Sequence, residues 1–175
     1  MTDTPRTRQV DDDVLAKYLH SHLIAGNSGK RLFDEAAKAW EGTFHASALS
    51  RLAREVSEDA DELEKIVQAL GLEPPAHRKA VAWATEQAAK VDPLNPAHAA
   101  GGRAGQLELE SLLTAVTGKC LLWKALLLLT GEGLPVDAAR LEQLHDRALH
   151  QISTLSEILR SATAANFRAD GTKQH

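Results

Sequence analysis

The sequence predicts an all-α protein, a single four-helix bundle with one long crossover connection. Four long segments repeat apolar residues three and four positions apart, which is the spacing of one face of an α-helix. Clusters of glycine and proline separate these segments, and we find no convincing strand. With 175 residues, of which 43% are hydrophobic, the chain can bury one core without disulfides or metals. We expect one domain over residues 11–164, with flexible ends at 1–10 and 165–175.

The most apolar segment, residues 106–130, is expected to form the central helix of the bundle. Its leucines continue around the helix at 121–129, so other segments must cover it on almost every side. Lys119 and Lys124 lie inside this segment, and we therefore expect it to pack in a soluble bundle and not to span a membrane. The stripe that is expected to face the core consists of Leu109, Leu112, Val116, Cys120, Trp123, Leu126 and Leu127.

The first helix is predicted to begin after Asp11–Asp13, where carboxylates cap the positive end of a helix dipole, and to continue to about Trp40. Gly26 and Gly29 each cost up to about 1 kcal/mol relative to alanine inside a helix. We expect a close helix–helix approach or a local distortion to compensate for them. The predicted inward residues are Val14, Tyr18, His22, Ala25, Gly29, Leu32, Phe33, Ala36 and Trp40.

The second helix is expected over residues 44–70, and the short break at 41–43 makes it the antiparallel neighbour of the first. Gly71 is predicted to end it. A short amphipathic helix at 76–90 then lies in a long crossover. The inward residues of the second helix are expected to be Leu49, Leu52, Val56, Asp59, Ala60, Leu63, Ile66, Val67 and Leu70.

The last helix is predicted to begin at Asp137, after a glycine- and proline-rich turn, and to continue to about Ala164. A short first turn, a long crossing and a short last turn give two antiparallel hairpins, which is the ferritin-like arrangement. The predicted inward residues of this helix are Leu141, Leu144, Ala148, Ile152, Leu155, Leu159 and Ala162.

Three segments carry a resemblance to a known group: YLHSHLIAGNSGKRLF, LAREVSEDADEL and LELESLLTAVTGKCLLWKAL. The chain resembles, from about Val14 to Ser161, an uncharacterised actinobacterial branch of the ferritin-like four-helix-bundle superfamily. This resemblance implies a fold more than a reaction. Functional di-iron members hold two metals with a Glu from each of two helices and a Glu-x-x-His pair from each of the other two.

The di-iron ligand set is incomplete in this sequence. The last helix contains one Glu-x-x-His pair, Glu142 and His145, whereas the second helix offers Glu55 and Glu58 without a histidine. We therefore expect no metal and no cofactor. Iron bound by these four weak candidates remains the alternative.

Three polar residues fall on the predicted inward stripes: His22, Asp59 and Lys119. Their distances from the two short turns place all three near the middle of the bundle. A carboxylate, an ammonium and an imidazole could satisfy one another there, so that Lys119 replaces the metal cation. A ligand-binding or catalytic role for the same polar core stays open.

Composition excludes several partners and functions. A net charge of −4 and 4% aromatic residues offer neither a basic field nor stacking platforms for nucleic acid. The single cysteine, Cys120, has no thiol partner, which suits a reducing cytoplasm, and the N-terminus carries no apolar targeting segment. No phosphate loop, nucleophile elbow or paired-cysteine motif is present.

Two function classes follow from these observations. The first is a non-catalytic binding or structural protein with a degenerate metal site, and the second is a di-iron or other metal-binding oxidoreductase or iron-handling protein. The outer face of the central helix, with Leu121, Leu122, Leu128 and Leu129, predicts a homodimer, covered in part by the crossover. An adaptor for a partner helix would use this same face.

Overall fold

The computed structural model describes residues 10–72 and 101–168, and these residues form four long α-helices and no strand. The predicted crossover helix at 76–90 lies outside the described residues, as do residues 1–9 and 169–175. The fold class over the described part of the chain is therefore all-α. The helices are α1 (Asp12–Ala39), α2 (Ala46–Ala69), α4 (Gly102–Thr130) and α5 (Ala138–Asn166).

Local chemistry sets the helix ends where the sequence predicts them. Asp11 and Asp137 cap α1 and α5, and each side chain accepts two hydrogen bonds from backbone N–H groups of the first turn, at 3.0–3.3 Å. Gly71 ends α2 with a φ of 67°, and the next N–H, of Leu72, donates to the carbonyl of Val67 at 3.1 Å. The exceptions are modest: α4 begins before residue 106 and α5 continues past residue 164.

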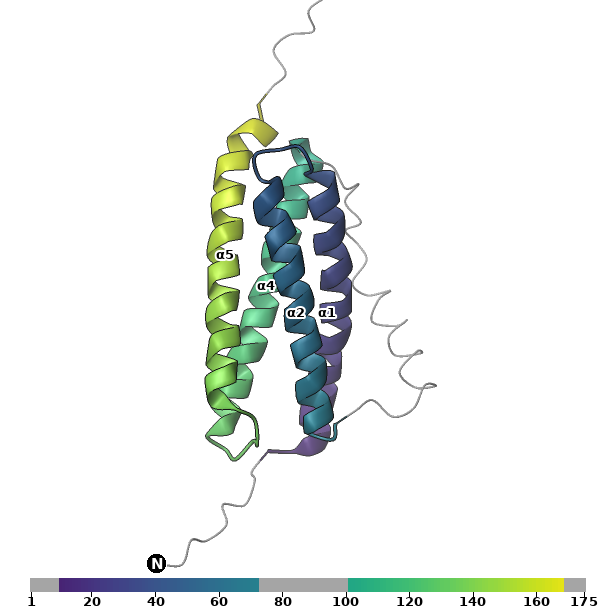
Figure 1. Cartoon of the computed structure of the whole chain (residues 1–175), viewed down its shortest axis with the longest axis vertical. Coiled ribbons are helices and arrows are strands. Elements are labelled where there is room, and N and C mark those ends of the chain that lie inside the picture. The colour runs from purple at the N-terminus through teal and green to yellow at the C-terminus, as the bar shows by residue number, and fades with distance from the viewer. Residues whose placement is uncertain (1–9, 73–100, 169–175) are drawn as a thin grey trace, which may run out of the picture.

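The helices form two antiparallel hairpins, α1 with α2 and α4 with α5 (Figure 1). Helix α1 runs upward in this view, α2 and α4 run downward, and α5 returns upward. Helices α2 and α4 are therefore parallel, as the predicted connection lengths require. Between the hairpins, α1 packs against α4 more closely than α2 packs against α5.

The inward face of α1 differs from the prediction in the first two turns. Leu15 and Leu19 are buried there, whereas Val14 is 64% exposed and Tyr18 is half-buried. Successive residues of a helix differ by about 100° in direction, so the predicted stripe, which starts one residue before Leu15, points away from the core in these turns. From Gly29 onward every buried residue of α1 belongs to the predicted stripe. Ala25, which precedes this segment and is also predicted to face inward, is exposed.

The leucines of α4 also need a correction. Leu122, which was expected on the outer face, is only 1% exposed and belongs to the core. It follows Lys119 by three positions, so both residues lie on the broad face that α4 turns to the other helices. The large apolar residues of this helix that are exposed are Leu121 and Leu128, whereas Leu129 is half-buried.

The apolar core is divided into two clusters along the bundle axis. One contains Leu63 of α2, Trp123 of α4 and Ala148 of α5, and the other contains Val56 and Val116 with Leu155. The residues between these clusters form a middle layer, which contains polar side chains and a cavity. Its polar members are Asp59, Lys119 and Gln151.

Candidate functional site

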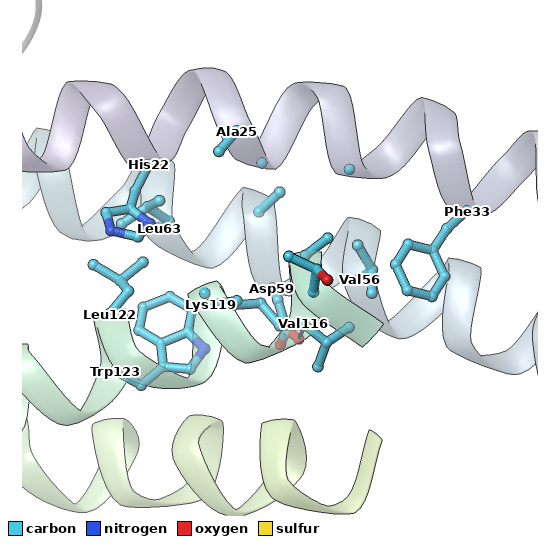
Figure 2. A pocket seen from close by; sticks show the side chains of 16 residues that line it. His22, Ala25, Phe33, Val56, Asp59, Leu63, Val116, Lys119, Leu122 and Trp123 are labelled. Atoms are coloured by element: carbon cyan, nitrogen blue, oxygen red, sulfur yellow. Dashed lines mark hydrogen bonds and ion pairs between the residues drawn. The ribbon is translucent and has the colours of Figure 1, made fainter. Parts of the chain in front are cut away.

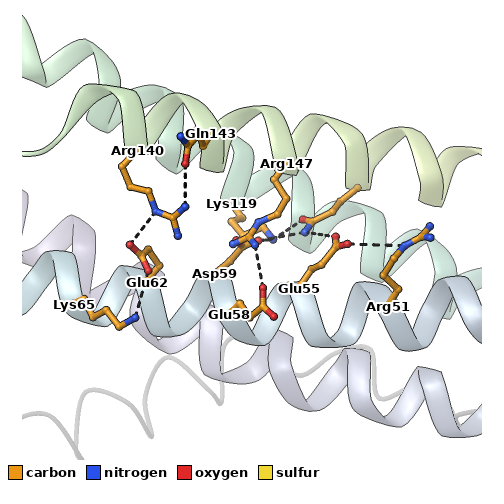
Figure 3. Close-up of polar contacts among 11 residues, drawn as sticks. Arg51, Glu55, Glu58, Asp59, Glu62, Lys65, Lys119, Arg140, Gln143 and Arg147 are labelled. Atoms are coloured by element: carbon orange, nitrogen blue, oxygen red, sulfur yellow. Dashed lines mark hydrogen bonds and ion pairs between the residues drawn. The ribbon is translucent and has the colours of Figure 1, made fainter.

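Asp59 is the centre of the middle layer. Its carboxylate is fully buried on α2 and is surrounded by donors from the other hairpin. Lys119 of α4 donates to Oδ2, Arg147 of α5 donates to Oδ1, and the amide of Gln151 donates to Oδ2 at 3.3 Å (Figure 3). A buried carboxylate is stable only when charge and hydrogen bonds compensate for its lost hydration, and these three donors supply both.

Lys119 is held from two sides. Its ammonium donates to Asp59 and also, at 2.6 Å, to Oε1 of Gln151, while the amide of Gln151 donates at 3.0 Å to Glu55. Burial lowers the pKa of Lys119 below its usual value, and the adjacent Asp59 carboxylate opposes that shift. The Asp59 carboxylate therefore favours the charged form of the lysine.

Polar contacts continue along the line where α2 faces α5 (Figure 3). Arg147 donates to Glu58, and Arg140 donates to Glu62, each at 3.1 Å. The hydrogen bond from Arg140 lowers the pKa of Glu62. These contacts join two helices that pack less closely than α1 and α4 do, and the line between them is polar and not leucine-rich.

A cavity of about 270 Å³ lies on the other side of the Asp59–Lys119 pair, between α1, α2 and α4 (Figure 2). Most of its wall is apolar, and the polar groups on it belong to His22, Asp59, Thr114, Lys119 and Trp123. Ala25 of α1 and Thr114 and Ala115 of α4 line the cavity and are exposed. The cavity therefore opens to the surface between α1 and α4.

Glycines inside two helices create much of this space. A Cβ atom added at Gly29 or at Gly118 would meet no atom within 4 Å, and neither residue has a positive φ. Only Gly26 shows the close approach that was predicted, because a Cβ there would lie 3.5 Å from the Cβ of Ala60. Gly29 and Gly118 are thus explained by the cavity and not by backbone conformation or packing.

Two ring side chains stand at the end of the cavity near Leu63. His22 makes an edge contact with Tyr18, with ring centroids 4.7 Å apart, and burial lowers the pKa of His22. Within the described residues, no hydrogen bond joins it to Asp59 or Lys119, which corrects the three-residue cluster that the sequence predicts. Trp123 is fully buried, and it lines the same cavity from α4.

The four metal-ligand candidates do not come together. Glu55 contacts Gln151, Glu58 pairs with Arg147, Glu142 is exposed, and Nδ1 of His145 lies 3.9 Å from its neighbour Asp146. Over residues 10–72 and 101–168, no three His, Cys, Asp or Glu side chains form a group that could hold a metal ion.

Two partners of Asp59 were missed at the sequence level, although signals for both existed. Gln151 follows Ala148 by three positions and precedes Leu155 by four, so it fits the inward stripe better than Ile152. Arg147 follows Arg140 by seven positions, which places both on one side of α5, and the acidic residues of α2 from Glu55 to Glu62 recur every three or four positions. A basic side of one helix and an acidic side of another would have predicted contacts between them.

Comparison with family models, curated proteins and solved structures finds no match to this chain. The described residues define a class, which is a four-helix all-α bundle. This bundle contains the buried Asp59–Lys119 pair and the cavity beside it.

Proposed function

We propose that this chain is a non-catalytic binding protein that takes a small, mostly apolar molecule into the cavity between α1, α2 and α4. The observation that carries this proposal is the pair of glycines in the cavity wall. Glycine inside a helix costs about 1 kcal/mol relative to alanine. Since neither Gly29 nor Gly118 is needed for a turn or a close contact, stability alone would favour alanine at both positions.

The size of the cavity limits the ligand. A dry protein cavity of about 150 Å³ accepts benzene, and pockets for larger ligands begin at about 300 Å³. The cavity of about 270 Å³ lies between these cases. It therefore suits a molecule of one or two rings, or an aliphatic molecule of similar volume.

The charged groups support binding more than catalysis. Asp59 and Lys119 are committed to each other and to the side chains of α5. A general base or a nucleophile needs a lone pair that is available to the substrate, and these contacts occupy both carboxylate oxygens of Asp59 and two N–H groups of Lys119. Burial lowers the pKa of His22, so the imidazole favours its neutral form in the wall.

Titration calorimetry with indane, a neutral two-ring hydrocarbon, tests this proposal. We expect saturable binding with one molecule per chain. Gly118→Leu should weaken binding at least about tenfold because its side chain enters the cavity. Thr117→Leu is the matched control, since Thr117 is exposed on the same helix and does not line the cavity. Equal affinities in both variants would contradict the proposal.

We also propose that the bundle is ferritin-like and that Lys119 occupies the place of a lost metal. The parallel course of α2 and α4 and the mid-bundle position of Lys119 support this relation. The alternative is an iron-handling or oxidoreductase function. Elemental analysis of untagged protein, repeated after anaerobic incubation with ferrous iron, separates the two. Stoichiometric iron that is lost in Glu142→Ala or His145→Ala would favour the alternative.

A cytoplasmic location is part of the same proposal. Cys120 is buried in the core, and burial raises the pKa of its thiol. A buried thiol with a raised pKa reacts slowly, and it serves as a small apolar side chain. This use of the single cysteine is compatible with a reducing compartment.

A further inference from the structure

The two described tryptophans differ in how their indole N–H groups are satisfied. Nε1 of Trp40 donates to Oε2 of Glu108 at 2.8 Å, and both residues are buried. Nε1 of Trp123 is also buried, but it has no hydrogen-bond acceptor among the described residues. An unpaired buried donor opposes folding, so an acceptor that enters the cavity gains a hydrogen bond without displacing one inside the protein.

The unpaired donor belongs to the cavity. Trp123 lines it, and Figure 2 shows the nitrogen of its ring on the side that is nearer to Asp59. Lys119 is one helical turn before Trp123, so both side chains lie on the same face of α4. The wall near them also contains Leu63, Leu122 and the imidazole of His22.

We propose that the ligand carries a neutral hydrogen-bond acceptor, such as a ketone, aldehyde or amide carbonyl, that binds Nε1 of Trp123. This inference rests on the proposed binding function and specifies the chemistry of the ligand. The apolar part of the ligand fills the space beside Gly29 and Gly118, and its carbonyl oxygen reaches the indole. The ammonium of Lys119 can support the same oxygen, because only two of its three N–H groups have acceptors among the described residues.

Charge balance favours a neutral acceptor over a carboxylate. Lys119 and Arg147 are already matched by Asp59 and Glu58. A ligand carboxylate would bring another negative charge into a mostly apolar cavity beside the buried carboxylate of Asp59. Desolvation and like-charge repulsion both oppose this arrangement, whereas a carbonyl brings no net charge.

Three ligands of nearly equal shape test the inference: indane, 1-indanone and indane-1-carboxylate. Calorimetry gives the dissociation constant of each for the full-length protein and for Trp123→Phe, which keeps an aromatic ring but removes the N–H. We expect the ratio of indane to 1-indanone dissociation constants to fall by about threefold to tenfold in Trp123→Phe, as for a neutral hydrogen bond. Indane-1-carboxylate should bind the wild type most weakly.

A spectroscopic measurement on the wild type decides the question even if Trp123→Phe does not fold. In the 15N-labelled protein, 1-indanone should move one indole N–H resonance downfield at saturation, and indane should move it much less. Thr117→Leu is the control for both readouts, because its substitution lies outside the cavity.

The remaining outcomes separate this inference from the proposed function. If Trp123→Phe leaves the ratio of the indane and 1-indanone dissociation constants unchanged, and no indole resonance distinguishes the two ligands, the proposed hydrogen bond to Trp123 is wrong. The cavity then remains a binding site. If the carboxylate binds most tightly, the neutral acceptor is wrong. If none of the three ligands binds, both the inference and the proposed function fail.

Discussion

Asp59 accepts hydrogen bonds from three side chains, and each of them belongs to the other hairpin. Lys119 and Arg147 bring two positive charges, and Gln151 adds a neutral donor. Because the carboxylate is fully buried, removing it leaves these donors without their shared acceptor. The loss of a partner from a buried ion pair costs more than the pair contributes relative to an apolar replacement.

Substitution of Asp59 by alanine should lower the free energy of unfolding by about 3–5 kcal/mol, as expected when a buried charge is stranded. Urea unfolding at neutral pH measures this change. Asp61→Ala is the matched control, because Asp61 lies on the same helix and pairs with Lys30 at the surface. Such exposed pairs contribute less than about 1 kcal/mol. Similar losses in the two variants would refute the central role of Asp59.

His22 should make stability depend on pH. Burial lowers its pKa from 6.5 in the folded state, so below pH 6.5 the unfolded chain takes up a proton that the folded protein still refuses. The contribution of His22 to the free energy of unfolding is therefore fully present above pH 6.5, and it is lost as the pH decreases toward the folded-state pKa. His22→Gln should reduce the loss of unfolding free energy between pH 7 and pH 5.

The exposed His150 on α5 provides the control for this experiment. His150→Gln should leave the pH dependence of stability as it is in the wild type. The prediction for His22 is wrong if both variants show the same slope of unfolding free energy against pH.

Single residues were predictable where their position on a helical stripe was unambiguous. Asp59 and Lys119 fall on such stripes, and charge made them conspicuous among apolar neighbours. The sequence could not predict that Trp40 finds an acceptor and Trp123 does not. That difference depends on which side chains of other helices meet each indole, and helix periodicity carries no information about it.

Helix α1 contains two interior glycines, and each has a different structural explanation. Gly26 lies close to Ala60 of α2, whereas Gly29 faces the cavity. At Gly29 the helix is therefore intrinsically less stable than it would be with alanine, although no neighbouring helix comes close enough to require glycine there. Packing against α2 and α4 must stabilise this part of the helix instead.

Gly29→Ala should raise the free energy of unfolding by about 0.5–1 kcal/mol, because alanine is the better helix former and its Cβ meets no other atom. Gly42→Ala is the contrasting variant. Gly42 has a φ of 79° in the α1–α2 turn, so a side chain there strains the backbone and should destabilise the protein. Thermal unfolding of both variants measures the difference, and a destabilising Gly29→Ala would contradict the open space at that position.

Helix ends were more predictable than helix faces. Asp11, Asp137 and Gly71 act on backbone groups within a few residues, so local sequence determines what they do. The face of a helix depends on what packs against it. The broad core side of α4 includes Leu122 because three other helices surround that level of the bundle, and sequence alone does not reveal their distances.

For the whole molecule, the apolar surface of α4 predicts self-association. Leu121 is 59% and Leu128 is 69% exposed, and they lie two turns apart on one face. We propose that a second copy of the chain covers this face. Sedimentation equilibrium at micromolar concentration should give about twice the chain mass of 18.9 kDa.

A double variant, Leu121→Glu with Leu128→Glu, should sediment as a monomer. Leu149→Glu is the control, because Leu149 is 48% exposed on α5 and lies outside this face of α4. A wild-type monomer at micromolar concentration would disprove the dimer and leave the face available to the crossover or to another protein.

The arrangement of the four helices was predictable from connection lengths, because a short turn can only return the chain beside itself. The division of the core was harder to foresee. It requires Asp59, Lys119 and Gln151 to meet between the two apolar clusters, and the helical stripes predicted an inward position for Asp59 and Lys119 but not for Gln151.

The Asp59–Lys119 ion pair of the middle layer also fixes the alignment of the helices along their axes. Leucine stripes repeat every turn, so two such helices could slide past each other by about 5.4 Å and still interdigitate. Such a slide would separate Asp59 from Lys119 and place each charge against leucines of the neighbouring cluster. The ion pair therefore favours one axial alignment of the two hairpins and disfavours the shifted ones.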